Sequence, residues 1–98
     1  MNVNALLMHP NDNVVTCIVE IDAGQTVTYV NGNTICTLQA HENIPYCHKI
    51  ALSDLSEGDD VMKYGESIGK ISQPIKQGHW VYHKNLFSVP RDYDSEMI

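Results

Sequence analysis

The chain has 98 residues, a length that suits one domain. Of these residues 43% are hydrophobic and 18% are charged, a composition that excludes a disordered chain. Six basic residues against twelve acidic ones give a net charge of −6. Because the basic residues are scattered, we expect no nucleic-acid partner. With no apolar run of about 20 residues and no signal core, we expect a cytoplasmic protein without a membrane partner.

The first segment with chemically useful side chains is residues 9–13, which precedes a β-branched run at residues 14–19. His9 can transfer a proton near neutral pH, and Asn13 can hold a substrate hydroxyl or carboxylate. Asn and Asp side chains also cap their own backbone in turns. Considered alone, the segment therefore favours a turn over a site.

A β-hairpin is predicted in the first half of the chain, with strands at residues 26–30 and 34–38. Asn31-Gly32 between them favours a type I′ turn, in which both central residues have positive φ. Residues 81–83 are a further strand candidate. The chain is therefore expected to be mostly β.

The pattern aliphatic, two residues, Gly, two residues, Val occurs at residues 21–27, 55–61 and 75–81. Each copy can turn on its glycine and return the valine to the core. Because the copies are unequally spaced, they predict one irregular β domain and not a solenoid. Helix is limited to one short turn that begins at Ser53 or Asp54.

A second segment, residues 44–52, contains the pair His48-Lys49 just before an apolar run at residues 50–52 that we expect to be buried. A lysine held on such a support can bind a carboxylate, or act as a base if burial lowers its pKa. Considered alone, the pair is better explained as solvated side chains.

Metal and disulfide signals are weak. Cys17, Cys36 and Cys47 include no Cys-x-x-Cys pair, so we expect reduced, mostly buried thiols and no structural zinc site. His79 and His83 are four apart in a strand-like context, where their side chains lie about 13 Å from each other. A metal shared by these two histidines is therefore not expected.

Four short motifs together resemble a known family. They are His-Pro-x-Asp-Asn-Val at 9–14, Ile-Pro-x-x-His-Lys-Ile-Ala-Leu at 44–52, Asp-Leu-x-x-Gly at 54–58 and Lys-Tyr-Gly-Glu-x-Ile-Gly at 63–69. The series is similar to the SAF domain of altronate and galactarate dehydratases and to the small subunit of sulfolactate sulfo-lyase. The resemblance implies a single small SAF domain of β-clip type at residues 1–88, with short hairpins, little helix and an acidic tail or linker at 89–98.

The resemblance also implies a function. The chain would be the small subunit or N-terminal domain of a hydro-lyase or sulfo-lyase that performs β-elimination on a small hydroxylated carboxylic acid. It would need a larger lyase domain or subunit and, in the complete enzyme, a divalent metal such as iron or manganese. The residues assigned are His9, His48 and Lys49 for catalysis and Asp12, Asn13, Tyr64 and Asn85 for substrate binding, with metal ligands unassigned.

Two alternatives stay open at this stage. The chain can instead be a non-catalytic module that binds sugar acids or anions, or a regulatory domain that gates a partner enzyme. A homo-oligomer is also compatible with the resemblance. Purified chain that performs elimination without a partner would contradict the subunit hypothesis.

The sequence departs from the family pattern at two places. Cys47 stands where the family has glycine, so the loop would be strained if this position needs positive φ. Residues 82–85 (Tyr-His-Lys-Asn) replace a His-x-His-Asn ending of altronate-type members, which puts altronate in doubt as the substrate.

Overall fold

Frequent turns divide this chain into short strands, and the computed structural model describes residues 2–87. The strands are β1 (Ala5–Leu6), β2 (Val14–Cys17), β3 (Thr26–Asn31), β4 (Thr34–Gln39), β5 (Lys49–Ala51), β6 (Asp60–Lys63), β7 (Glu66–Ile71), β8 (Trp80–Val81) and β9 (Leu86–Phe87). The expectation of a small, mostly β domain is confirmed. The expected helical turn beginning at Ser53 or Asp54 is wrong, because the chain bends at this point and then forms a β-bridge at Leu55. In the part of the chain that is described, no helical segment is suited to crossing a membrane.

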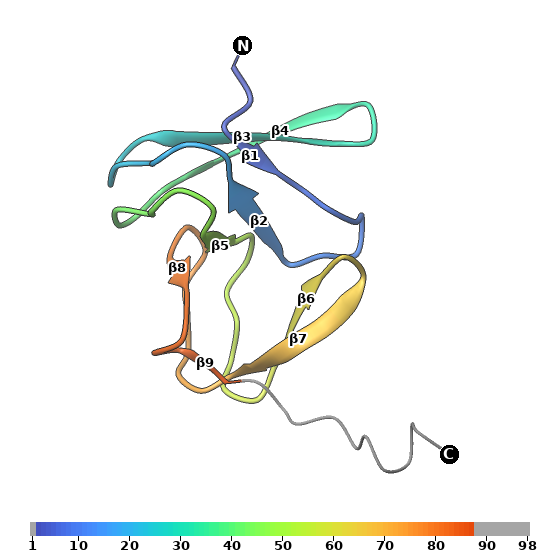
Figure 1. Cartoon of the computed structure of the whole chain (residues 1–98), viewed down its shortest axis with the longest axis vertical. Coiled ribbons are helices and arrows are strands. Elements are labelled where there is room, and N and C mark those ends of the chain that lie inside the picture. The colour runs from blue at the N-terminus through green and yellow to red at the C-terminus, as the bar shows by residue number, and fades with distance from the viewer. Residues whose placement is uncertain (1, 88–98) are drawn as a thin grey trace.

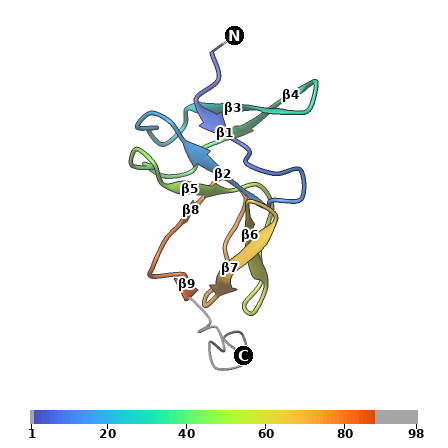
Figure 2. The same ribbon diagram turned by 45° about the vertical axis from the view of Figure 1, so that its right-hand side comes forward.

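A central antiparallel sheet separates two hydrophobic cores. Its strand order is β1-β2-β5-β8, with the β3–β4 hairpin on one side and the β6-β7-β9 sheet on the other (Figures 1 and 2). Because successive residues of a strand point to opposite faces, Val15 and Ile50 pack toward the first hairpin. Their neighbours Val14 and Ala51 pack toward the second hairpin. The central sheet is thus buried on both faces.

Four similar turns connect these layers. They span residues 22–25, 45–48, 56–59 and 76–79, and in each the carbonyl of the first residue accepts a hydrogen bond from the amide of the fourth, at 3.0–3.2 Å. The third residue has positive φ in every case, namely 89° at Gly24, 69° at Cys47, 88° at Gly58 and 86° at Gly78. The recurring pattern in the sequence therefore marks real turns, and it has a fourth copy at residues 44–50.

The turns belong to an internal repeat of turn, hairpin, turn and strand. β-Bridges join Ile21 to Ile44 in the first half and Leu55 to Ile75 in the second. Each bridge closes the base of a hairpin, which is β3–β4 in the first half and β6–β7 in the second. The molecule therefore consists of two similar halves that pack on opposite faces of one sheet.

Cys47 was expected to be strained if its position needs positive φ, and the position does. Its φ of 69° falls in the same positive-φ region as the glycines of the other three turns, at 86–89°. A side chain in this region costs roughly 1–2 kcal/mol. The fourth copy escaped the sequence pattern because cysteine replaces glycine and Ile50 replaces valine.

The two hairpin turns differ from the expectation. Asn31 pairs with Thr34, so the first loop is residues 32–33, and only Gly32 has positive φ, as in a type II′ turn. The type I′ turn lies instead in the second hairpin, where Tyr64 and Gly65 have φ of 57° and 75°. The first hairpin is confirmed, with its turn shifted by one residue.

Candidate functional site

Asp12 is a buried carboxylate that fixes the tip of the second hairpin. Its exposed fraction is 7%, and its two oxygens accept hydrogen bonds from the amides of Tyr64 (2.9 Å) and Gly65 (2.8 Å). Backbone amides bound to a carboxylate form charge-assisted hydrogen bonds, which are stronger than neutral ones. Asp12 therefore holds the β6–β7 turn in place. Its predicted contact with substrate stays a prediction.

Asn13 holds the first strand of the same hairpin. Its Nδ2 donates to the Asp60 carbonyl and its Oδ1 accepts from the Met62 amide, both at 2.8 Å, where the β6–β7 register shifts between Val61 and Met62. Asn4 makes the equivalent pair of bonds in the first half, to the Thr26 carbonyl and the Thr28 amide. An asparagine before a central strand thus clamps each hairpin, which gives Asn13 a structural role beside its predicted one.

His9 lies against the tip that Asp12 holds. A Cβ built on Gly65 would lie 3.0 Å from the His9 ring, so glycine is what allows the ring to approach the turn. The His9 Nδ1 atom accepts a hydrogen bond from the Asn11 amide at 3.1 Å. In the neutral ring the proton is therefore on Nε2, which makes Nε2 the donor.

Lys49 projects from the central sheet toward the second hairpin. It stands directly opposite Thr16 and Val81 in the strand ladders, and Val81 belongs to the second core. Burial, and then the nearby positive charge of Lys63, lower the pKa of Lys49. His9 and Lys49 therefore both lie on the side of the central sheet that carries the second hairpin.

Tyr64 and Lys63 extend this site along the hairpin tip. Tyr64 is 64% exposed, and the Lys63 Nζ atom lies 5.6 Å from the centroid of its ring, within cation–π range. Lys63 lies between Met62 and Tyr64, whose amides Asn13 and Asp12 bind. Sequence reasoning missed Lys63, although it begins the motif at residues 63–69.

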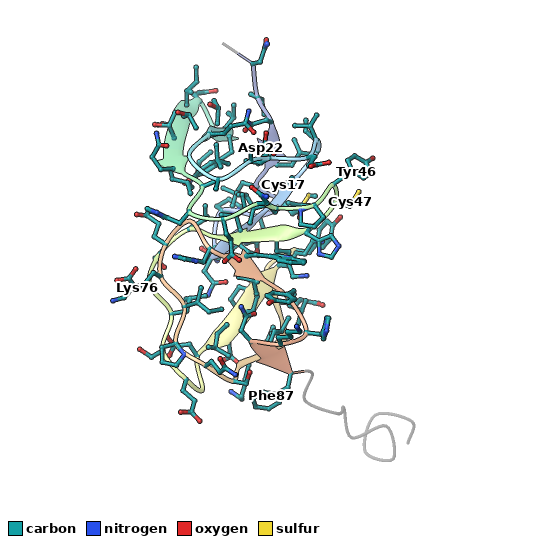
Figure 3. The ribbon with its side chains drawn as sticks, turned by 90° about the vertical axis from the view of Figure 1, so that its left-hand side faces the viewer. Cys17, Asp22, Tyr46, Cys47, Lys76 and Phe87 are labelled. Carbon is teal, nitrogen blue, oxygen red and sulfur yellow. The ribbon has the colours of Figure 1, made fainter. Side chains whose placement is uncertain are left out.

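His48 is separated from Lys49 by the alternation of the strand. Its Nδ1 accepts a hydrogen bond from Trp80 Nε1 at 3.0 Å, and Trp80 packs against the first core and stacks on Tyr82. Figure 3 shows the preceding residues of the turn, Tyr46 and Cys47, at one edge of the molecule. His48 thus joins an aromatic cluster, apart from the Lys49 side chain.

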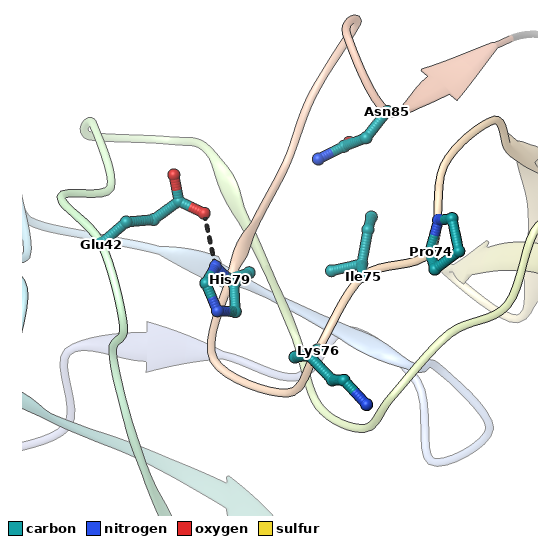
Figure 4. Close-up of a pocket in the computed structure, with 6 residues that line it drawn as sticks. All are labelled: Glu42, Pro74, Ile75, Lys76, His79 and Asn85. Atoms are coloured by element: carbon teal, nitrogen blue, oxygen red, sulfur yellow. Dashed lines mark hydrogen bonds and ion pairs between the residues drawn. The ribbon is translucent and has the colours of Figure 1, made fainter.

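Asn85 closes the loop after β8 and binds the backbone on either side of Val81, the ladder partner of Lys49. Its Nδ2 donates to the Trp80 carbonyl and its Oδ1 accepts from the Tyr82 amide, both at 2.8 Å. It also lines a pocket of about 180 Å³ with Glu42, Lys76 and His79 (Figure 4). Both polar atoms of the Asn85 side chain are thus occupied with backbone groups, and its predicted contact with substrate stays a prediction.

The pocket contains an imidazole–carboxylate pair that the sequence did not reveal. Glu42 Oε2 lies 2.9 Å from His79 Nδ1 and also accepts the Trp80 amide hydrogen bond, while the His41 ring stacks on His79. Glu42 and His79 are 37 residues apart, so no local spacing signals their contact.

Cysteines and metal ligands complete the survey of reactive groups. Cys17 is buried, which raises the pKa of its thiol to about 12, but Cys47 is exposed, so the expectation of mostly buried thiols holds only for Cys17. No three His, Cys, Asp or Glu side chains between residues 2 and 87 are grouped to hold a metal ion. We therefore assign no metal ligand and no metal-dependent step to these residues.

Comparisons with known proteins agree with the motifs. Residues 3–89 match the family described as altronate/galactarate dehydratase SAF domain. The chain is 32% identical to (2R)-sulfolactate sulfo-lyase subunit alpha of Chromohalobacter salexigens over 88% of its own length and 95% of that subunit. It is 33% identical to altronate dehydratase of Bacillus subtilis and 30% identical to galactarate dehydratase of Escherichia coli, covering only 15% and 13% of those enzymes.

Proposed function

Because the chain belongs to the altronate/galactarate dehydratase SAF-domain family, we propose that it is the small component of a lyase that acts on a hydroxylated carboxylic acid. The observation that carries this proposal is the placement of His9 and Lys49 on one side of the central sheet, each on a firm support. Lys49 stands on a strand buried on both faces, and His9 rests on a turn fixed by Asp12.

The proposed chemistry is β-elimination beside a carboxylate, which needs three groups. A cation holds the carboxylate and the charge that develops on it, a base removes the α-proton, and an acid protonates the leaving group. We assign the cation to the Lys49 ammonium, which is half-buried and has no carboxylate partner among the described residues. A charge in such a place attracts an anion more strongly than one in open water.

We assign to His9 the hydrogen bond that polarises the leaving group. As the bond from the β-carbon to the leaving group breaks, its electron pair leaves with that group, and the neutral His9 ring donates a hydrogen bond to it from Nε2. The bond between the Asn11 amide and Nδ1 keeps Nδ1 unprotonated and orients the ring for this donation. The acid that gives the leaving group its proton belongs to the larger partner in this proposal. The base that removes the α-proton belongs to the larger partner in this proposal, because His48, the other histidine assigned to catalysis, faces the aromatic cluster.

The larger partner is supported by the coverage of the relatives. The chain spans nearly the whole sulfo-lyase subunit alpha but only about one seventh of each dehydratase. A chain of this kind therefore occurs both as a separate subunit and as a small part of a longer enzyme. We expect no turnover by the purified chain alone.

The test combines the chain with the large lyase component from the same organism and measures elimination on 2-hydroxy acids. His9→Phe, which keeps a ring but removes the donor, is expected to lower kcat by about 10²–10³. Lys49→Met is expected to lower kcat/KM about tenfold to a hundredfold. Lys76→Met is the control, because Lys76 projects from the edge opposite Tyr46 and Cys47 (Figure 3) and pairs with Asp54 in solvent.

The pH profile separates binding by Lys49 from a merely structural role. Lys49 binds a carboxylate only while protonated, so activity should fall as pH rises through its pKa, which lies below the ordinary 10.5. Lys63→Gln removes a repelling charge and should move this alkaline limit to higher pH. Full activity in both the His9 and Lys49 variants would refute the assignment.

A further inference from the structure

The outer edge of β4 differs from the other outer edges of the two hairpins. On β3, Asn4 binds the Thr26 carbonyl and the Thr28 amide, and Asn13 binds the equivalent groups of β6. The return strand of the second hairpin, β7, pairs with β9. Within residues 2–87, however, β4 pairs with β3 alone. The outer edge of β4 is therefore free to pair with a further strand.

The backbone groups that β4 directs outward belong to Ile35 and Thr37. Asn4 binds both the amide and the carbonyl of Thr28, so these two groups face away from β4. Thr37 is the ladder partner of Thr28, and opposed residues of this kind in an antiparallel pair both direct their backbone groups away from each other. Because the direction alternates along a strand, Ile35 faces outward as well. Each of these residues offers one donor and one acceptor.

The turn at residues 76–79 closes the base of this edge. The Gly78 carbonyl accepts a hydrogen bond from the His41 amide at 2.9 Å, and a Cβ built on Gly78 would collide with the Gln39 carbonyl. A long strand laid along β4 would therefore run into this turn. A strand that turns back before it reaches Gln39 avoids the collision, and the tip of a hairpin is such a strand.

The β3–β4 hairpin lacks the features that keep exposed strands from pairing. Proteins protect edge strands with charged side chains, prolines and bulges. Residues 26–39 contain no charged residue and no proline, and their ladder runs without a register shift. Residues 60–71 of the second hairpin carry charges of both signs, and their register shifts between Val61 and Met62. Because the two hairpins share one plan, the unprotected edge is a property of the first hairpin and not of the plan.

The exposed face beside this edge is apolar. Val30 and Ile35 form a cross-strand pair and are 40% and 57% exposed. The whole chain has a net charge of −6, so two copies repel each other overall. An uncharged hairpin with an apolar face is the surface on which two copies can approach with the least repulsion.

We propose that two copies of this chain pair through β4, in antiparallel orientation about a two-fold axis at Ile35. The amide and carbonyl of Ile35 bond to those of the partner's Ile35, and the two side chains lie side by side on the apolar face. In the same register Thr37 opposes the partner's Asn33. The partner chain then turns back at the partner's Gly32 and leaves Gln39 clear. The result is one continuous sheet in the order β3-β4-β4-β3.

Sedimentation of the full chain between about 10 μM and 1 mM tests for this dimer. A reversible dimer is expected, and hydrogen exchange of the Ile35 and Thr37 amides should slow as the concentration rises. Ile35→Lys places two ammonium groups opposite each other and should raise the dimer Kd at least about tenfold. Because Ile35 is exposed, this variant should fold. Val19→Lys adds the same charge at another exposed residue, which follows the segment that bonds to Asn4 on the β3 side, and should leave Kd unchanged.

Disulfide trapping tests the register. In a background of Cys36→Ser and Cys47→Ser, Ile35→Cys should give a disulfide-linked dimer on oxidation by copper phenanthroline. The reason is that the Cα atoms of a hydrogen-bonded pair lie about 5.5 Å apart, within reach of a disulfide. Val30→Cys is the matched control, since Val30 shares the face of Ile35 but stands on β3, which both β4 strands separate from the partner's β3. It should give at least about tenfold less linked dimer.

The dimer is independent of the lyase proposal. The β3–β4 hairpin lies on the opposite side of the central sheet from the second hairpin (Figures 1 and 2), whereas His9 and Lys49 lie on the side of the second hairpin. A chain that stays monomeric up to about 1 mM, or a dimer that Ile35→Lys leaves intact, would overturn the dimer and leave the lyase role standing. Equal trapping of the two introduced cysteines would also overturn it.

Discussion

The two halves of the molecule share a backbone plan and differ in chemistry. Both use two turns with positive φ, a β-bridge and a hairpin clamped by an asparagine. The first hairpin, residues 26–39, contains no charged residue, whereas the second, residues 60–71, contains Asp60, Lys63, Glu66 and Lys70. The two halves therefore share one scaffold, and the second hairpin adds charged side chains to it.

This comparison separates structural side chains from candidates for function. Asn13 has a counterpart in Asn4, whose two backbone partners lie 34 residues before the two partners of Asn13. These bonds therefore belong to the repeated scaffold. The carboxylate of Asp12 and the ring of His9 contact the second hairpin at its type I′ tip, Tyr64-Gly65. The first hairpin has a different, uncharged tip at Gly32.

The largest expected effect is a difference in stability between variants of Gly24 and Gly78, which occupy the third position of two similar turns. A Cβ at Gly78 would collide with the Gln39 carbonyl and the His41 ring, whereas a Cβ at Gly24 meets nothing within 4 Å. Gly24→Ala should cost about 1–2 kcal/mol from positive φ alone. Gly78→Ala should cost about 2–5 kcal/mol, because overpacking adds to the same strain.

Chemical denaturation of both glycine variants measures this difference in the free energy of unfolding. Equal losses would show that the two turns do not differ in their surroundings.

A smaller effect is expected when the asparagine clamps are removed. Asn4→Ala and Asn13→Ala each leave one backbone amide and one carbonyl without a partner, so each should lower the free energy of unfolding by about 1–3 kcal/mol. Thermal and urea unfolding of the two variants provide the comparison. A variant of Asn13 with unchanged stability would break the equivalence and favour its predicted role in substrate binding.

The smallest effect concerns the one turn without glycine. Cys47→Gly should relieve the positive-φ strain of roughly 1–2 kcal/mol, and the added freedom of the unfolded chain offsets about half of that gain. The free energy of unfolding should therefore rise by up to about 1 kcal/mol. Cys47→Ala keeps the strain and is the matched control, and a gain in both variants would point to the thiol and not to φ.

The sequence was most informative where structure is local. Glycine tolerates positive φ, β-branched runs favour strands, and both preferences act within a few residues, so the turns and the first hairpin were predictable. The family motifs likewise marked the segments that hold His9, Asp12 and Lys49. The exact loop of the first hairpin was missed because a shift of one residue changes little in local preference.

Only the tertiary structure decided which side chains meet. Strand alternation places His48 with Trp80 and Lys49 with Thr16, although the two residues are neighbours in the chain. The contacts of Glu42 with His79 and of the loop before β2 with β6 join residues tens of positions apart. Such contacts depend on strand register and on the packing of the two hairpins against one sheet, which no local pattern encodes.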